Sequence, residues 1–328
     1  MVFRFGQGLP NVNIIETKAL TKIFSPGRGL FGVDLAVAEG AIFGFLGPNG
    51  SGKTTTIRLL LDFLRPDSGE ARVFGLDCRR DSVAIRAKVG YVPGEVRLPE
   101  RLTGREFLEY HCGLRRLAFP EQRLKELKEA LDVTTNLRIK SLSKGNKQKL
   151  ALIQAFLHEP AVVLLDEPTE GLDPLVQQGF YALLETYRSR GGAVFMSSHV
   201  LSEVERVCDS VAIIRAGRVV AIERVEDLVR RKVRHLELVF AEEIDREQFM
   251  SRVPGLTLRE WAGRRASFSV SGAVDPVVKS LAAFQLADLS FAPVSLEEAF
   301  LDFYRGDPGG DRVAVDLQAT EHDGGDCK

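Results

Sequence analysis

Residues 47–54 read GPNGSGKT and fit the pattern G-x-x-x-x-G-K-T. The run lies between an apolar segment, residues 41–46, and a segment with helical spacing, residues 54–64. Glycines let successive backbone N–H groups curl around one anion, and the helix that follows adds the positive end of its dipole. The stretch therefore predicts a strand, a phosphate-binding loop and a helix. A glycine-rich turn that binds no ligand is the alternative.

The side chains of this loop suit a nucleoside triphosphate with its metal ion. Lys53 is expected to reach the β- and γ-phosphates of ATP, and the Thr54 hydroxyl is expected to bind Mg²⁺. The loop residues that we assign to nucleotide binding are Gly47, Pro48, Asn49, Gly50, Ser51, Gly52, Lys53, Thr54 and Thr55.

A second motif ends an apolar strand with two carboxylates. Residues 162–167 read VVLLDE, and neither a core strand nor a simple surface turn requires that pair of acids. Asp166, at the end of the strand, can hold Mg²⁺ through its water shell, and Glu167 is placed to polarise the water that attacks the γ-phosphate. A charged turn at the end of a strand is the alternative.

Strand and helix patterns alternate along the rest of the chain. Residues 13–20, 33–38, 89–93, 161–165 and 193–197 have strand patterns, and residues 103–110 and 117–132 have helical ones. This alternation predicts an α/β fold with a parallel sheet. Beyond residue 217, strand patterns at 235–240 and 266–270 and helical patterns at 245–252 and 276–284 predict a small α+β domain, and Ser295 with Glu298 predicts a further capped helix.

We divide the chain into four parts on this basis. They are a flexible start (1–12), a nucleotide-binding domain (13–228), a small α+β accessory domain (229–305) and an acidic tail (306–328). The tail has repeated glycine and no periodic apolar pattern, so we expect it to be disordered.

Composition excludes several classes of protein. The chain has 328 residues, of which 45% are hydrophobic and 27% charged, as in a globular protein. Its net charge of -1 and the lack of a long basic block give no reason to expect nucleic acid as a partner. The four cysteines have no metal-binding spacing, and no apolar run approaches the ~18 residues of a membrane span. If the protein works at a membrane, we expect it to bind at the membrane surface rather than to span the bilayer.

Residues 14–218 resemble the ATPase domain of the ABC superfamily, with every motif in the family's order. The LSKGN of residues 142–146 resembles the signature LSGGQ, the GLD of residues 171–173 resembles the D-loop, and His199 resembles the switch histidine. The resemblance implies that His199 contacts the γ-phosphate, that Ser143 and Gly145 contact phosphate, and that Phe24 stacks on adenine. An aromatic residue at position 24 is equally compatible with a place in the core.

The resemblance also implies an architecture. The expected fold is a P-loop NTPase of the ABC type, with a parallel sheet core, an antiparallel β subdomain and a helical subdomain, followed by the small C-terminal α+β domain. In this family the signature of one subunit closes over ATP held by another. Since the chain has one phosphate loop and one signature, a homodimer or a pair with a similar partner is implied.

The chain departs from the family pattern in two places. Its signature has Lys144 for the usual glycine and Asn146 for the usual glutamine. The glutamine expected after GYVP is missing, because the chain continues with Gly94 and Glu95. Whether Glu95 replaces that glutamine as a Mg²⁺ ligand stays open.

The end of the chain indicates the kind of system that ATP hydrolysis drives. Residues 295–301, SLEEAFL, are similar to the end of ATPase subunits that pair with separately encoded, membrane-spanning permeases of bacterial exporters for drugs, antibiotics or lipids. The implied place is the cytoplasmic face of the membrane. An accessory domain that stabilises the dimer or only fills space, a non-transport ATPase acting on ribosomes or DNA, and an ATP-sensing regulator without turnover are the alternatives.

Overall fold

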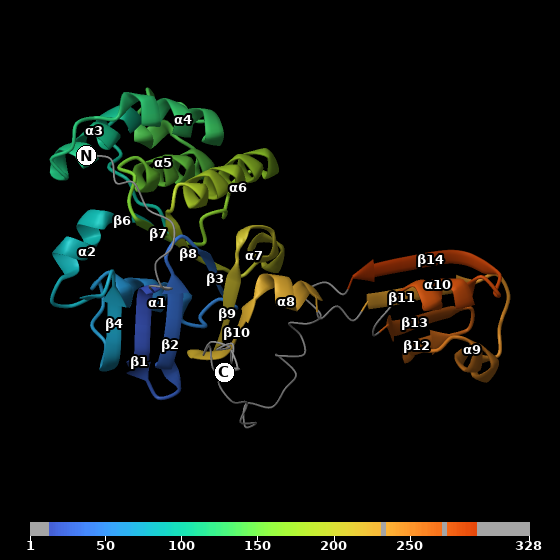
Figure 1. Ribbon diagram of the computed structural model, residues 1–328. Helices are drawn as coiled ribbons and strands as arrows, with labels where there is room; N and C mark the ends of the chain where they lie inside the picture. The colour runs from blue at the N-terminus through green and yellow to red at the C-terminus, as the bar shows by residue number, and fades with distance from the viewer. Residues whose placement is uncertain (1–12, 231–233, 271–273, 294–328) are drawn as a thin grey trace, which may run out of the picture.

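The computed structural model describes residues 13–230, 234–270 and 274–293 (Figure 1). The expected flexible start, the capped helix from Ser295 and the acidic tail lie outside these residues. Among the described cysteines, Cys78, Cys112 and Cys208 are buried free thiols. None of the helices within the described ranges combines the length and the apolar character that a membrane span requires.

The central sheet has six strands in the order β10-β9-β3-β8-β7-β6, and every neighbouring pair except β10 and β9 is parallel. The strands are β3 (Ile42–Leu46), β6 (Val89–Val92), β7 (Val162–Asp166), β8 (Ala193–Ser198), β9 (Ser210–Arg215) and β10 (Arg218–Arg224). All residues of β3, β7 and β8 are buried, as expected for parallel strands covered on both faces. Because these three strands are parallel neighbours, their carboxyl ends meet at one edge of the sheet.

A second, antiparallel sheet covers one face of the first (Figure 1). Its order is β2-β1-β4-β5, with β1 (Asn13–Ser25), β2 (Arg28–Ala38), β4 (Ser68–Val73) and β5 (Leu76–Asp77). Side chains from this sheet, from α1 (Lys53–Leu60) and from β3 form one hydrophobic core that includes Leu20, Phe45 and Ile57. This packing fixes α1, and with it the phosphate loop, against the end of β3.

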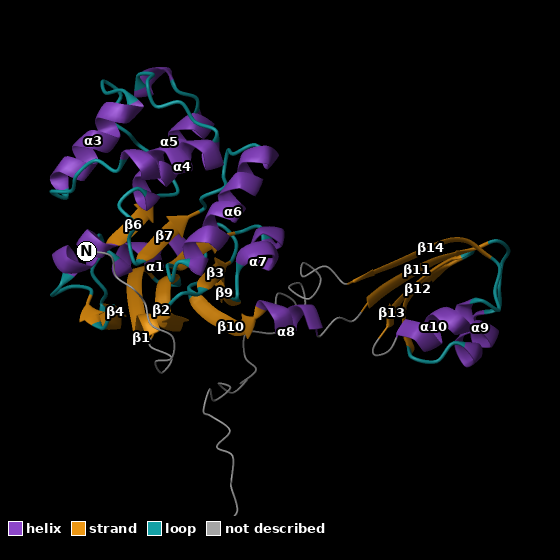
Figure 2. Cartoon of the chain, turned by 45° about the horizontal axis from the view of Figure 1, so that its top comes forward, coloured by secondary structure: helices purple, strands orange, loops and turns teal. Residues whose placement is uncertain are grey.

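Helices cover the other face (Figure 2). They are α3 (Gly104–Leu114), α4 (Glu121–Leu131), the 3-10 turn η1 (Ile139–Ser141), α5 (Lys144–Phe156), α6 (Pro174–Ser189), α7 (Leu201–Val207) and α8 (Val225–Arg230). Helix α2 (Ser82–Lys88) instead contributes Ile85 to the core that the antiparallel sheet shares. The capping box expected at Thr103 is confirmed, since its side chain accepts the Glu106 N–H while the Glu106 carboxylate accepts the Thr103 N–H.

The C-terminal unit has a hydrophobic core of its own. Its elements follow in the order β11 (Arg234–Phe240), α9 (Arg246–Arg252), β12 (Leu256–Ala262), β13 (Arg265–Val270), α10 (Val274–Leu281) and β14 (Leu286–Pro293). The sheet order β12-β13-β11-β14 and this β-α-β-β-α-β sequence are those of a ferredoxin-like unit. Phe240, Phe249, Trp261 and Phe268 stack at its centre.

The predicted fold class is confirmed, and several helix boundaries differ from the sequence pattern, such as α10, which was expected over residues 276–284. Two of the differences have a visible cause. The helix expected over residues 54–64 ends at Leu60, because Asp62 has a φ of 57° and the N–H groups of Phe63 and Leu64 fold back onto the Arg58 carbonyl. The helix expected over residues 117–132 begins only at Glu121, directly after Pro120. In both cases a local backbone constraint sets the end of the helix, although the apolar sequence pattern extends past it.

Candidate active site

The phosphate loop connects the buried strand β3 to the first turn of α1. Gly50 and Gly52 have φ values of 80° and 118°, which only glycine adopts readily. Gly52 caps α1 without a side-chain hydrogen bond, so the N–H groups of the first turn keep their capacity to bind an anion. The hydroxyl of Ser51 is buried and has no hydrogen-bond partner among the described residues. A loop with unused donors at a helix N-terminus is suited to hold phosphate.

Lys53, Glu167 and His199 form a connected series of polar contacts. Lys53 Nζ lies 3.0 Å from Glu167 Oε1 and donates to the carbonyl oxygens of Gly47 at 2.6 Å and Pro48 at 3.3 Å. The other Glu167 oxygen, Oε2, lies 2.8 Å from Nδ1 of His199. Lys53 is 5% exposed and His199 46%, so the series runs from the buried loop to the surface.

Thr54 and Asp166 meet on the other side of the loop. Thr54 Oγ1 donates to Asp166 Oδ2 at 2.7 Å, although 112 positions separate the two residues. Asp166 Oδ1 accepts from the hydroxyl of Ser197, also at 2.7 Å, and the same hydroxyl accepts the N–H of Glu167 at 3.1 Å. Sequence reasoning did not assign a role to Ser197. The available signal was the pair of serines that ends the apolar strand β8.

Glu167 has an unusual backbone conformation. Its φ is 49°, in the left-handed region that residues with a Cβ atom seldom adopt. Such a conformation costs on the order of 1–3 kcal/mol and persists only where the surroundings impose it. Here the Glu167 N–H donates to the Ser197 carbonyl at 3.2 Å, which ties the turn after β7 to β8. The turn aims the carboxylate at Lys53 and His199.

The signature residues lie at the start of α5, against the segment that resembles the D-loop. Ser143 caps this helix, and its side chain accepts the N–H of Asn146 at 3.2 Å. A Cβ atom on Gly145 would come within 2.8 Å of the Gly171 carbonyl, so this close backbone contact requires glycine. Lys144 pairs with Glu170 at 2.6 Å. The unusual lysine of the signature is thus neutralised within the chain.

The structure places Phe24 and Glu95 at the surface. Phe24 is 51% exposed at the end of β1, which removes the alternative that it belongs to the core. The Glu95 carboxylate pairs with Arg97, with Oε1 and Oε2 at 2.9 and 3.0 Å from the same guanidinium nitrogen. At the position before it, a Cβ atom on Gly94 would lie 3.1 Å from Asp166 Oδ2. The segment that carries Glu95 therefore passes directly beside the buried carboxylate.

The oxygen atoms around Asp166 fit a magnesium ion. Mg²⁺ prefers carboxylate and hydroxyl oxygens together with several waters. Thr54 Oγ1 and Asp166 Oδ2 supply two such oxygens next to the phosphate loop. Gly94 lies beside the same Oδ2 oxygen, which a Cβ atom at that position would approach to 3.1 Å. The residues present therefore suit a hydrated ion that also contacts phosphate.

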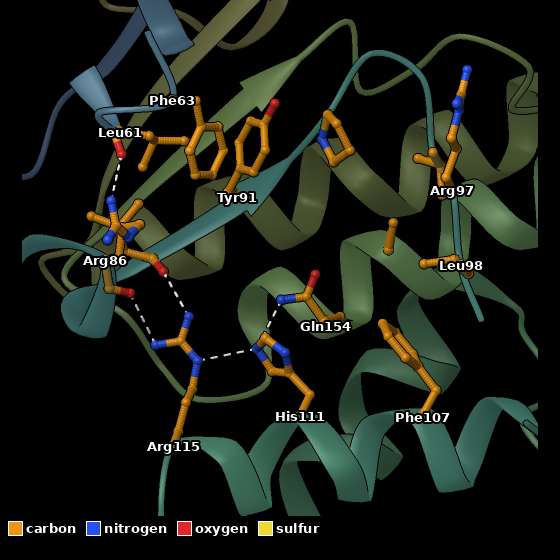
Figure 3. Close-up of a pocket in the computed structure, with 14 residues that line it drawn as sticks. Leu61, Phe63, Arg86, Tyr91, Arg97, Leu98, Phe107, His111, Arg115 and Gln154 are labelled. Atoms are coloured by element: carbon orange, nitrogen blue, oxygen red, sulfur yellow. Dashed lines mark hydrogen bonds between the residues drawn. The ribbon is translucent and has the colours of Figure 1, made fainter. Parts of the chain in front are cut away.

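A groove of about 330 Å³ opens beside this segment (Figure 3). Residues that follow α1, strand β6, the 93–98 segment, α3 and α5 line it, and among its side chains are Phe63, Tyr91, Arg97, Phe107 and His111. Burial, with a smaller effect of the Asp166 charge, raises the pKa of Tyr91 to about 12. The groove thus has a mostly apolar lining and reaches toward the carboxylate site.

Arg115 and His111 tie the helices around the groove together (Figure 3). Arg115 Nη1 donates to the carbonyl of Ala87 at 2.8 Å, and its Nε donates to His111 Nε2 at 3.1 Å. Gln154 Nε2 lies 2.9 Å from the same His111 nitrogen. Because arginine only donates, Nε2 of His111 accepts and its ring is neutral. The network joins α2, α3 and α5.

Acidification is expected to weaken this part of the fold. Burial, together with the Arg115 charge, lowers the pKa of His111 to about 4 and that of neighbouring His158 to about 3. An unfolded histidine titrates near 6.5, so below that pH the unfolded chain binds more protons than the folded one. Stability should therefore fall as the pH drops from about 6.5 toward 4.

The measurement is the urea midpoint of unfolding at pH 5 and pH 7. The wild-type midpoint should fall more than that of the double variant His111→Gln/His158→Gln, which has no group to protonate at these sites. His199→Gln, at an exposed histidine, serves as the control, and its urea midpoint should fall by the same amount as that of the wild type. Equal losses in the wild type and the double variant would contradict the assignment.

Comparisons with known proteins agree with this geometry. A sequence profile of the family described as ABC transporter matches residues 30–170. Daunorubicin resistance ATP-binding protein DrrA3 of Streptomyces coeruleorubidus is 36% identical over 221 residues, covering 65% of this chain and 69% of that protein. Bacitracin transport ATP-binding protein BcrA of Bacillus licheniformis is 32% identical over 236 residues, covering 70% and 76%. A solved structure described as the ATP binding subunit of an ABC transporter matches with a TM-score of 0.62 and 30% identity, over 66% of this chain and 92% of that one.

Proposed function

This chain belongs to the family of ABC transporter ATP-binding proteins, and we propose that it powers an exporter whose membrane-spanning permease subunits are separate polypeptides. Its ATPase fold and its kinship with ATP-binding subunits support this function over a non-transport ATPase or a regulator without turnover. The relatives named for daunorubicin resistance and bacitracin transport favour a drug or an antibiotic as the exported compound, and a lipid is the further candidate. The protein would act as a peripheral subunit at the cytoplasmic face of the membrane.

The observation that carries the proposal is the series of contacts from Lys53 through Glu167 to His199. Lys53 holds one oxygen of the Glu167 carboxylate, and His199 Nδ1 contacts the other. Phosphate oxygens compete for Lys53, and their binding would leave Glu167 free to take a proton from the attacking water. His199 would then face the γ-phosphate. Binding of ATP itself thus prepares the base.

Thr54 and Asp166 would hold Mg²⁺, with Glu95 as a further candidate ligand from the adjacent segment. The ion would neutralise charge on the β- and γ-phosphates. Asp166 is 1% exposed and is oriented by Ser197, so its carboxylate keeps a fixed direction. Glu95 would have to leave Arg97 to reach this site.

Two copies of the chain would build the complete site. Ser143 caps α5 and Gly145 lies in its first turn, where it packs on Gly171. In the proposed dimer, one chain would present these residues to the ATP held by the other. A homodimer with two equivalent ATP sites follows, closing when ATP binds and opening after hydrolysis. The groove beside Glu95 and Arg97 would receive the permease, because the 93–98 segment joins that groove to Asp166.

Phe24→Ala is expected to weaken ATP binding more than it slows hydrolysis. Stacking of an aromatic ring on a base is worth about 1–3 kcal/mol, which corresponds to a roughly 5- to 100-fold increase in Kd. Calorimetric titration with ATP measures the Kd, and phosphate release at saturating ATP measures kcat. Tyr110→Ala, at a 60% exposed aromatic residue on α3, is the matched control. Equal affinity in Phe24→Ala and the wild type would remove the stacking role.

The test of the function is capture of the partner. Tagged Glu167→Gln protein, incubated with ATP and Mg²⁺, is purified from detergent-solubilised membranes of cells that produce it, and the co-purifying proteins are identified. A multi-span permease is the expected result, and Lys53→Ala protein without nucleotide shows what binds independently of ATP. Recovery only as a dimer free of membrane proteins, or with ribosomes or DNA, would overturn the transport role.

A further inference from the structure

Glu203 is a buried carboxylate that the hydrolysis scheme does not use. It lies on α7 and is 8% exposed. Its two oxygens accept hydrogen bonds from two hydroxyls, Thr169 Oγ1 at 2.5 Å and Ser198 Oγ at 2.8 Å. Burying a carboxylate is costly even when it is hydrogen-bonded, and an uncharged side chain would fill the same space at lower cost. The position therefore calls for a functional explanation.

On one side, Glu203 controls the backbone around His199. Ser198 precedes the histidine, and its hydroxyl oxygen accepts the N–H of Val200 at 2.9 Å. This hydrogen bond joins the residues on the two sides of His199. The same hydroxyl donates its proton to Glu203. The Ser198 carbonyl also accepts the N–H of Gly47 in the phosphate loop at 3.2 Å. A shift of the Glu203 carboxylate would therefore turn His199.

On the other side, Glu203 holds the loop between β7 and α6. Thr169 is 6% exposed and follows Glu167 by two positions. The neighbouring Pro168 carbonyl accepts from Gln148 on α5 at 2.9 Å, in a buried hydrogen bond. The Leu172 N–H donates to the Thr169 carbonyl at 3.0 Å. The loop thus connects the signature helix to Glu203.

We propose that Glu203 is a positioning residue that couples the 168–173 loop, and through it the signature helix α5, to the orientation of His199. A displacement of the loop at the dimer interface would pull Thr169 against Glu203, and Glu203 would move Ser198 and the adjacent histidine. The site would then be complete only when the loop occupies its closed position. The proposal rests on the ATPase function and the dimer proposed above.

The first test is a double-mutant cycle that measures kcat in Glu203→Gln, in His199→Ala and in the combined variant. The amide keeps the size of the side chain but has an NH₂ group in place of one carboxylate oxygen. One of the two hydroxyls, Thr169 or Ser198, therefore loses its acceptor. Misplacement of a reacting group by about 1 Å costs on the order of 100-fold in rate, so we expect kcat to fall about 10- to 100-fold with an unchanged KM for ATP. In a His199→Ala background the same substitution should have no further effect. Glu205→Gln, at an exposed glutamate two positions on, is the control.

A second test does not depend on turnover. The ring resonances of His199 in nucleotide-free protein, identified by their loss in His199→Ala, should shift in Glu203→Gln and also in Ser198→Ala and Thr169→Val. The shift from Thr169→Val decides the proposal, because Thr169 acts on His199 only through Glu203 in this scheme. An unchanged His199 spectrum in Thr169→Val, or equal loss of kcat from Glu203→Gln with and without His199, would overturn it. Absence of ATPase activity in the wild type would instead count against the proposed function.

Discussion

Replacing Glu167 with glutamine is expected to lower kcat for ATP by about 100- to 10,000-fold, the usual contribution of a general base. Glutamine preserves the shape of the side chain but cannot accept the proton of the attacking water. The ion pair with Lys53, at 3.0 Å, is lost as well, so Lys53 is free to bind phosphate. ATP should therefore bind at least as tightly as in the wild type, and the dimer should stay closed.

Phosphate release measures kcat in this variant, and size-exclusion chromatography with ATP and Mg²⁺ measures the closed dimer. Glu185→Gln is the matched control, because that carboxylate is 46% exposed and pairs with Arg188 on α6 rather than with Lys53. Undiminished ATPase activity in Glu167→Gln would remove Glu167 as the base. Lost activity without a dimer would locate the defect in binding or folding instead.

Replacing Lys53 with alanine should raise the Kd for ATP by about 100-fold or more. A hydrogen bond to a charged group is worth about 1.5–3 kcal/mol, and Lys53 is expected to contact two phosphates. The variant also leaves Glu167 without its cation in a largely buried place, since this carboxylate is 15% exposed. Turnover should disappear together with binding.

Calorimetric titration with ATP distinguishes this loss from the one in Glu167→Gln, which retains ATP. Lys22→Ala is a suitable control, because Lys22 is also paired with a carboxylate, that of Asp67, but lies outside the phosphate loop. Comparison of melting temperatures without nucleotide shows whether the unpaired Glu167 destabilises the fold. An unchanged Kd in Lys53→Ala would exclude the assigned role.

The sequence predicts the elements of the site better than their contacts. Residues 47–54 and 162–167 each follow an apolar strand, and that local pattern was sufficient to predict a phosphate loop and a pair of carboxylates at strand ends. The 2.7 Å contact of Thr54 with Asp166 depends on the order β3-β8-β7, which no local pattern encodes. Alternation predicts a parallel sheet but not the sequence of strands across it.

Other features have no distinctive signal in the sequence. Ser197 and Thr169 resemble ordinary serine and threonine residues near the ends of strands, and their roles depend on partners about thirty positions away. The edge strand β12 was not expected, because polar and charged residues interrupt its apolar pattern. The hairpin of β9 and β10 was not expected either, although the apolar runs at residues 211–214 and 219–222 were a signal for it. The groove beside Glu95 is lined by residues that lie between Leu61 and Gln154 in the sequence, so only the fold brings its lining together.

The left-handed backbone of Glu167 has a consequence for evolution. Glycine would adopt a φ of 49° without strain, so the glutamate side chain is retained at a conformational cost of about 1–3 kcal/mol that glycine would avoid. Its removal would leave the buried Lys53 without a carboxylate partner and would remove the proposed base. A glutamate there is evidence of sustained selection for chemistry, and the residue at this turn provides a simple criterion for separating working ATPases from decayed copies among related chains.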